Sequence, residues 1–298
     1  MRLIFTIILA ALMYLPMSVN AACSGASCCT VTAGVTTAPS GDSCETEPES
    51  YGITLYEKYL CTSMPTTPLD TAGGGPRAYD LELGTKCFRT FTSSDGSTVD
   101  MSSTSTSISF DGTFTRPPNG VYTHGVMLIK NEFRIKQDLE INAEILADTG
   151  TTGKFCETTG NTGAESDGNS LTCSATDGSA AGTFTSIMST FGGDCSSFDG
   201  DESFTFPSGD IIAAWLLDTD NHLAESCVEV VAKDRLFGVQ TFATPVVVTK
   251  STSGFNMAFG VSSGSSFWEN VGNNYSVGSG PFKAVSYTHL RAHETQSD

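Results

Sequence analysis

The clearest hydrophobic pattern in the chain runs from Val121 to Ile145, where apolar residues tend to occupy every second position. From Glu132 to Glu144 the even-numbered positions are all polar or charged. Because successive side chains of a β-strand point to opposite faces, a period of two predicts strands with one buried and one solvated face. Before Lys130 both sets of positions are apolar, which indicates a strand covered on both sides. We therefore expect this stretch to form the centre of an antiparallel β fold.

Several other runs are short, apolar and bounded by turn residues. Ile211–Leu217 is the longest uninterrupted apolar run after the N-terminal leader and predicts a buried strand. Lys86–Phe91 and Ser97–Met101 flank an Asp95-Gly96 pair, which predicts a β-hairpin. Since helical periodicity is almost lacking, the predicted fold class is all-β, with residues 51–283 forming an antiparallel β-sandwich or jelly roll.

The segment 148–210 differs from its surroundings because Gly, Ser, Thr and Asp dominate it and large apolar residues are few. We predict a loop-rich insert there, held by disulfides. Within it, Phe184, Ile187, Met188 and Phe191 have a spacing that favours one short helix.

The start of the chain has the features of a secretory signal peptide. Arg2 supplies a positive charge, Leu3–Leu15 is apolar, and small residues follow near position 21. The apolar run is shorter than the roughly 20 residues that a membrane-spanning helix needs. We predict a signal peptide over residues 1–21, and therefore a secreted or cell-surface protein with no integral membrane segment in its mature part.

The end of the chain is interpreted as foreign sequence. Val285–Thr295 reads VSYTHLRAHET, which is the translation in one frame of a transposase-type sequencing adapter. Such segments are excluded from fold reasoning. We therefore expect residues 285–298 not to be natural protein, and the β domain to be truncated at its C-terminus.

Charge narrows the choice of partners. The chain has 33 acidic and 15 basic residues, which gives a formal net charge of −18. Nucleic-acid binding depends on clustered Lys and Arg, and anionic membrane surfaces attract basic segments, so neither partner is expected.

The chain has ten cysteines, an even number that behind a signal peptide predicts disulfides. Metal binding is the alternative, but there is no Cys-x-x-Cys pair and histidine is rare. Four of the ten make residues 22–50 a Cys-rich extended segment. The pairing stays open among Cys23, Cys28, Cys29, Cys44, Cys61, Cys87, Cys156, Cys173, Cys195 and Cys227.

Acidic residues between positions 194 and 220 suggest one cofactor, calcium, which prefers hard oxygen ligands. Asp218-Thr219-Asp220 begins like a calcium-binding loop, but Leu223 stands where the turn glycine is required and His222 replaces an oxygen donor. The remaining hypothesis is a calcium site in a loop of irregular type. The alternative is that these acidic residues are solvated loop residues that bind no cation. The candidate calcium ligands are Asp199, Asp201, Glu202, Asp218 and Asp220.

A second candidate site surrounds Trp268, which is followed by Glu269 and Asn270. An aromatic ring beside amide and carboxylate groups is suited to binding sugar rings, whereas the alternative is a tryptophan of the hydrophobic core.

Enzyme motifs are lacking: the chain has no Gly-x-Ser-x-Gly, no His-Glu-x-x-His and no phosphate-binding loop. We predict a structural, adhesive or binding protein whose partner is an extracellular glycan or a surface protein. The alternatives are a carbohydrate-binding module, or a glycoside-active enzyme that uses two carboxylates.

Overall fold

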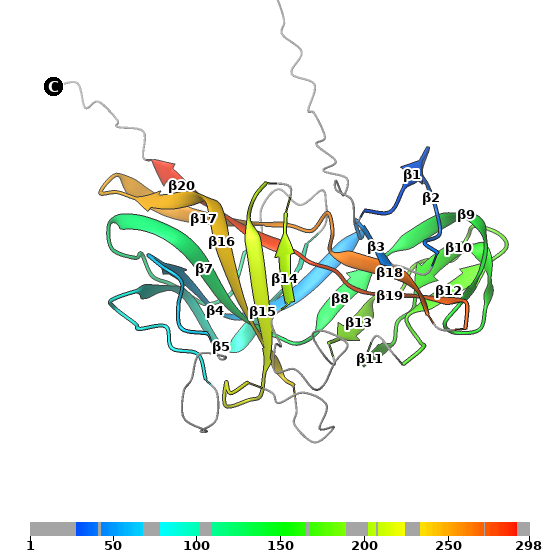
Figure 1. The fold of residues 1–298 in the computed structure, drawn as a ribbon, viewed down its shortest axis with the longest axis horizontal. Helices are drawn as coiled ribbons and strands as arrows, with labels where there is room; N and C mark the ends of the chain where they lie inside the picture. The colour runs from blue at the N-terminus through cyan, green and yellow to red at the C-terminus, as the bar shows by residue number, and fades with distance from the viewer. Residues whose placement is uncertain are drawn as a thin grey trace, which may run out of the picture.

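The computed structural model describes residues 28–40, 43–67, 78–101, 109–164, 167–188, 202–206, 208–223, 233–270 and 272–290. The predicted signal peptide lies outside these ranges. Every regular element within them is a β-strand, which confirms the all-β class (Figure 1). No helix of this part of the chain is long and apolar enough to cross a membrane.

The larger sheet has ten strands. In spatial order eight of them are β11 (Thr162–Ala164), β13 (Phe184–Ile187), β8 (Phe133–Lys136), β4 (Ser50–Cys61), β7 (Gly120–Lys130), β16 (Arg235–Val248), β15 (Ile211–Leu217) and β14 (Glu202–Thr205). The other two are β5 (Cys87–Met101), which pairs with β4, and β6 (Thr113–Phe114), which pairs with β5.

The second sheet has eight strands. In order six of them are β1 (Val31–Thr32), β2 (Val35–Thr36), β9 (Asp138–Ala147), β19 (Asn274–Ser279), β18 (Ser265–Asn270) and β3 (Ser43–Thr46). The remaining two, β10 (Thr152–Thr158) and β12 (Leu171–Ser174), extend the sheet from β9.

A two-stranded sheet joins β17 (Thr252–Gly260) to β20 (Lys283–Leu290). Residues 285–290 of β20 belong to the segment that we attribute to a sequencing adapter. The unpaired backbone groups of an edge strand can pair with an extended segment of any origin.

The pattern from Val121 to Ile145 predicted the strands at the centre of the molecule. In β8 and β9, Phe133, Ile135, Leu139 and Ile141 are buried, whereas the residues between them are wholly or partly exposed apart from Gln137. In β7, every residue from position 125 to 129 is buried, as expected for a strand covered on both faces. Ile211–Leu217 also forms the predicted strand, β15.

The predicted hairpin at Asp95-Gly96 is wrong, because β5 continues through it. Leu55 of β4 pairs with Ser97, and Glu57 pairs with Thr92, so the four residues between Thr92 and Ser97 bulge out opposite a single residue of β4. Gly96 has a φ of +80°, and a Cβ there would lie 2.5 Å from the Thr54 side chain. The Asp-Gly pair thus produces a bulge within a strand instead of a chain reversal.

The segment 148–210 is richer in strands than its composition suggested, since β10 to β14 all lie in it. The predicted short helix at Phe184 is wrong: Phe184–Ile187 is strand β13, which pairs with β8. Phe184 and Ser186 are buried and the residues after each are partly exposed, which is the alternation of a strand.

Disulfides are present, as the even number of cysteines predicted, and three of them have both cysteines within the described residues. They join Cys29 to Cys44, Cys61 to Cys87, and Cys156 to Cys173. The last two connect residues that lie directly opposite each other on paired strands. Cys28 is disulfide-bonded as well, and Cys23, Cys195 and Cys227 lie outside the described residues.

The main hydrophobic core joins the two sheets. Its buried members come from both sheets and include Tyr51, Ile53, Phe133, Leu139, Ile141, Leu171, Phe267 and Val277. A second cluster, around Trp215 and Phe237, covers the opposite face of the ten-stranded sheet.

The chain crosses from one sheet to the other at Gln137, between β8 and β9. Its side chain is 2% exposed. The Ser265 hydroxyl donates a hydrogen bond of 2.5 Å to Gln137 Oε1, and Gln137 Nε2 donates to Thr46 Oγ1. The backbone amide of Gln137 donates to Thr158 Oγ1 at 3.0 Å, and that of Thr158 donates to the Gln137 carbonyl at 2.9 Å. This corner therefore binds β3, β10 and β18 at once.

We expect Gln137→Leu to lower the free energy of unfolding by about 2–4 kcal/mol, because two buried hydroxyl groups lose their partners while the side-chain volume is kept. Urea denaturation followed by tryptophan fluorescence measures the change. Glu144→Leu, at an exposed position of β9, is the control. Equal stabilities for the two variants would show that the corner network contributes nothing specific.

Candidate functional site

A cleft of about 470 Å³ lies between the two sheets, where β3 and β18 face β7, β14, β15 and β16. We call it the inter-sheet cleft. Its apolar lining includes Met127, Ile129, Phe133, Met188, Phe204, Ile212, Ala214, Leu236, Pro281 and Phe282. Its polar lining includes Ser43, Glu45, Gln240, Ser266 and Trp268. The cleft thus combines an apolar interior with a small number of polar groups.

Small residues on two adjacent strands open the cleft. Gly238 of β16 lies directly opposite Ala214 of β15, and both residues line the cleft. A Cβ built on Gly238 would meet only the Leu236 side chain within 4 Å, at 3.6 Å. A larger side chain at this position therefore has room to enter the cleft.

The structure brings Trp268 and Asn270 together and separates Glu269 from them. Trp268 is half-buried and lines the cleft. Its Nε1 donates to Asn270 Oδ1 at 2.8 Å, and Asn270 Nδ2 donates to the Ser276 hydroxyl. Because side chains alternate along β18, Glu269 lies on the other face. The indole nitrogen is thus already hydrogen-bonded within the protein, and the part of Trp268 that borders the cleft is an aromatic ring.

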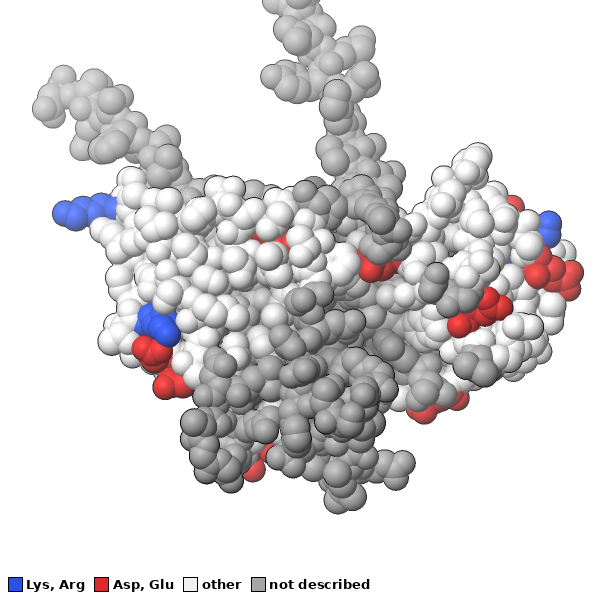
Figure 2. Space-filling model, viewed as in Figure 1, with Lys and Arg blue, Asp and Glu red and all other residues white. Residues whose placement is uncertain are grey.

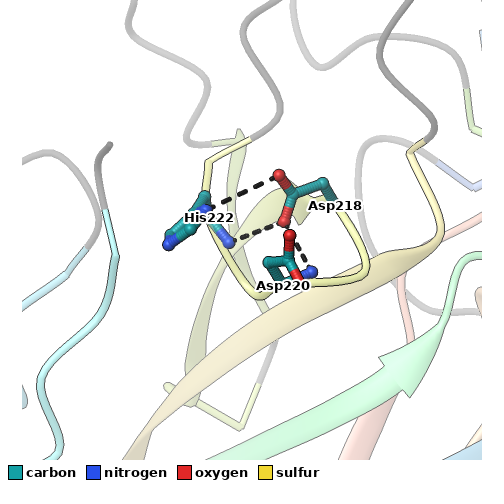
Figure 3. Close-up of side chains that lie close together, drawn as sticks. All are labelled: Asp218, Asp220 and His222. Atoms are coloured by element: carbon teal, nitrogen blue, oxygen red, sulfur yellow. Dashed lines mark hydrogen bonds and ion pairs between the residues drawn. The ribbon is translucent and has the colours of Figure 1, made fainter. Parts of the chain in front are cut away.

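The second predicted site is described in part. Asp199 and Asp201 lie outside the described residues, and Glu202 belongs to β14. Asp218 and Asp220 follow β15 and lie beside His222 (Figure 3). One ligand atom from each of these three residues lies within 4.8 Å of the others. This is the one such group in the described part of the chain.

Hydrogen bonds to the backbone explain most of the geometry of this loop. Asp218 Oδ1 accepts from the backbone amides of Asp220 and His222, each at 2.9 Å, and Asp218 Oδ2 lies 3.7 Å from His222 Nδ1 (Figure 3). An aspartate that bonds the amides following it stabilises a turn without a metal. If a cation binds here, an imidazole with two carboxylates suits zinc or manganese better than calcium. His222, which argued against calcium in the sequence, is therefore a member of the group.

Two buried charged residues were not anticipated from the sequence. Lys58 of β4 is buried, and desolvation lowers its pKa to about 8. Glu157 of β10 is buried too, and its Oε1 has no hydrogen-bond partner. Burial raises the pKa of Glu157, and the carboxylates of Asp138 and Asp177 raise it further. Neither residue belongs to a sequence motif, so only the pairing of the strands reveals its surroundings.

Comparisons with known proteins give no assignment: no family model matches the chain, and no curated protein or solved structure shows a significant match. Function is therefore argued from the site.

We expect Asp218→Ala to lower the free energy of unfolding by about 1–2 kcal/mol in the presence of EDTA, since two backbone amides lose their acceptor. Asp220→Ala, which removes a carboxylate that accepts no such bonds, should change it by less than about 0.5 kcal/mol. Chemical denaturation measures both. Equal losses would contradict the turn-forming role of Asp218, and a zinc-dependent rise in melting temperature that Asp220→Ala abolishes would establish a metal site instead.

Proposed function

We propose that this protein is a secreted or cell-surface binding protein that holds a small, mainly apolar ligand in the inter-sheet cleft. The observation that carries the proposal is the cleft itself. Its volume of about 470 Å³ falls within the range of small-molecule sites, and its lining combines apolar side chains with polar groups that could orient a ligand.

The compartment is argued from two features. The three disulfides in the described residues are typical of oxidising compartments. The predicted signal peptide is an independent reason to expect export. We further propose that the two large sheets form a β-sandwich in the broad sense, since one hydrophobic core joins them.

A neutral ligand suits the cleft best. The interior contributes side chains such as Leu236, Ile129 and Phe133, which bury apolar area and offer no hydrogen bonds. The formal net charge of −18 disfavours the approach of anions. Ser43, Ser266 and Gln240 supply the polar groups that would orient one polar end of the ligand.

A carbohydrate is the second candidate ligand, and the position of Trp268 favours it. The indole ring borders the cleft and offers an apolar face on which a sugar ring stacks. Among the residues that line the cleft, Glu45 is the acidic one, whereas a glycoside-active enzyme needs two carboxylates across the substrate. The lining therefore supports sugar binding more than sugar hydrolysis.

We expect the protein to bind the neutral probe N-phenyl-1-naphthylamine with enhanced fluorescence, and Gly238→Leu to weaken this binding at least about tenfold, because the new side chain occupies the cleft. Ala143→Leu, at an exposed position of β9, adds similar bulk elsewhere and should bind as the unmodified protein does. Thermal denaturation verifies that both variants are folded.

Unchanged probe affinity in Gly238→Leu would show that the probe does not use the cleft and would overturn the proposal. The carbohydrate alternative has its own test, a pull-down with soluble polysaccharides. Retention that is lost in Trp268→Ala but kept in Gly238→Leu would favour a glycan on the indole ring over an apolar ligand.

A further inference from the structure

Two carboxylates lie directly opposite each other on the hairpin of β9 and β10. β9 and β10 lie side by side (Figure 1), and in the register of this antiparallel pair Asp138 is the partner of Glu157 and Leu139 is the partner of Cys156. Leu139 and Cys156 point into the main hydrophobic core. Because side chains alternate, Asp138 and Glu157 lie together on the other face. Like charges directly opposite on paired strands destabilise a sheet.

Glu157 is the more constrained of the two. Its side chain is 2% exposed, and its buried Oε1 has no hydrogen-bond partner. An ionised carboxylate buried without a partner is costly, and native structures usually supply a donor, a cation or a proton to such a group. Within the described residues no hydrogen-bond donor reaches Glu157 Oε1.

Further acidic groups surround this pair. Asp177, which is exposed in the loop after β12, raises the pKa of both Glu157 and Asp138. Glu49 acts on Asp138 in the same direction, and Lys136 in the opposite direction. Lys136 forms an ion pair of 2.9 Å with Glu49, which lies at the edge of the group. The negative charge around Glu157 is therefore in excess.

We propose that Asp138, Glu157 and Asp177 form a calcium-binding site on the outer face of the β9–β10 hairpin. Calcium takes six to eight oxygen ligands, and carboxylates that bind through one or both oxygens, completed by water, supply them. A bound cation provides the partner that Glu157 Oε1 lacks and removes the repulsion across the strands. This site differs from the calcium ligands suggested by the sequence, and it is independent of the inter-sheet cleft.

Binding requires two side chains to turn. The carboxylate oxygens of Asp138, Glu157 and Asp177 do not all lie within 4.8 Å of one another in this structure. Asp138 and Asp177 are exposed, so rotation about their side-chain bonds meets little resistance, whereas Glu157 is held by its burial. The buried carboxylate thus anchors the ion and the two exposed ones close around it.

The test is thermal denaturation at pH 8 in EDTA and in about 10 mM CaCl2, with magnesium for comparison. For a dissociation constant of about 0.1–1 mM, typical of extracellular calcium modules, we expect calcium to raise the melting temperature by about 3–8 °C. Glu157→Gln should abolish this rise. In EDTA the same variant should melt higher than the unmodified protein, because it removes the uncompensated charge. Isothermal titration calorimetry should show binding that Glu157→Gln loses.

Two controls separate this site from other sources of calcium dependence. Glu144→Gln, an exposed position of β9, makes the same change in charge and should keep the full rise. Asp220→Asn should keep it as well, which excludes the loop of Asp218. The proposal is overturned if calcium leaves the melting temperature unchanged, or if Glu157→Gln responds as the controls do. A calcium-independent rise on lowering the pH from 8 to 5 would show that a proton neutralises Glu157 instead.

Discussion

The buried hydrogen bonds of Gln137 set the relation between the two sheets. Gln137 lies between β8, a strand of the ten-stranded sheet, and β9, a strand of the eight-stranded sheet. Its amide group holds hydroxyl groups of β3 and β18, and its backbone pairs with Thr158 of β10. A buried polar network of this kind is stable only when every member is bonded, so it fixes one arrangement of these strands. The inter-sheet cleft depends on that arrangement.

A second buried amide limits how the larger sheet bends. Asn131 lies in the break between β7 and β8, which both pair with β4, and its side chain donates to the carbonyls of Met188 and Lys233, both at 2.8 Å. It also accepts a bond of 3.2 Å from the Met188 amide. Met188 lines the cleft. Asn131 and Gln137, at the two ends of β8, therefore bind segments that form different walls of the cleft. The small residues Gly238 and Ala214 leave space between these walls.

The sequence predicted those features that depend on a local period, and missed those that depend on the partner strand. The alternation in β8 and β9 identifies buried positions because one face of each strand meets the core. The Asp95-Gly96 pair was misread because a bulge and a hairpin turn share the same residue preferences, and only the length of β4 distinguishes them. The position of Trp268 at a cleft could not be predicted from its neighbours in the sequence, because strands far away in the chain form the rest of the lining.

Acidic residues illustrate why a count of charges does not locate a cation site. The Asp218 carboxylate, which belongs to the richest acidic stretch of the sequence, already accepts two backbone amides and lies near an imidazole. Glu157 has no acidic neighbour in the sequence, where Cys156 and Thr158 flank it. The fold places it opposite Asp138 and within the electrostatic influence of Asp177, and its own Oε1 is buried without a hydrogen-bond partner. A buried carboxylate oxygen without a hydrogen-bond partner favours a cation more than solvated carboxylates do, and the burial of Glu157 follows from the folded sheet and not from its neighbours in the sequence.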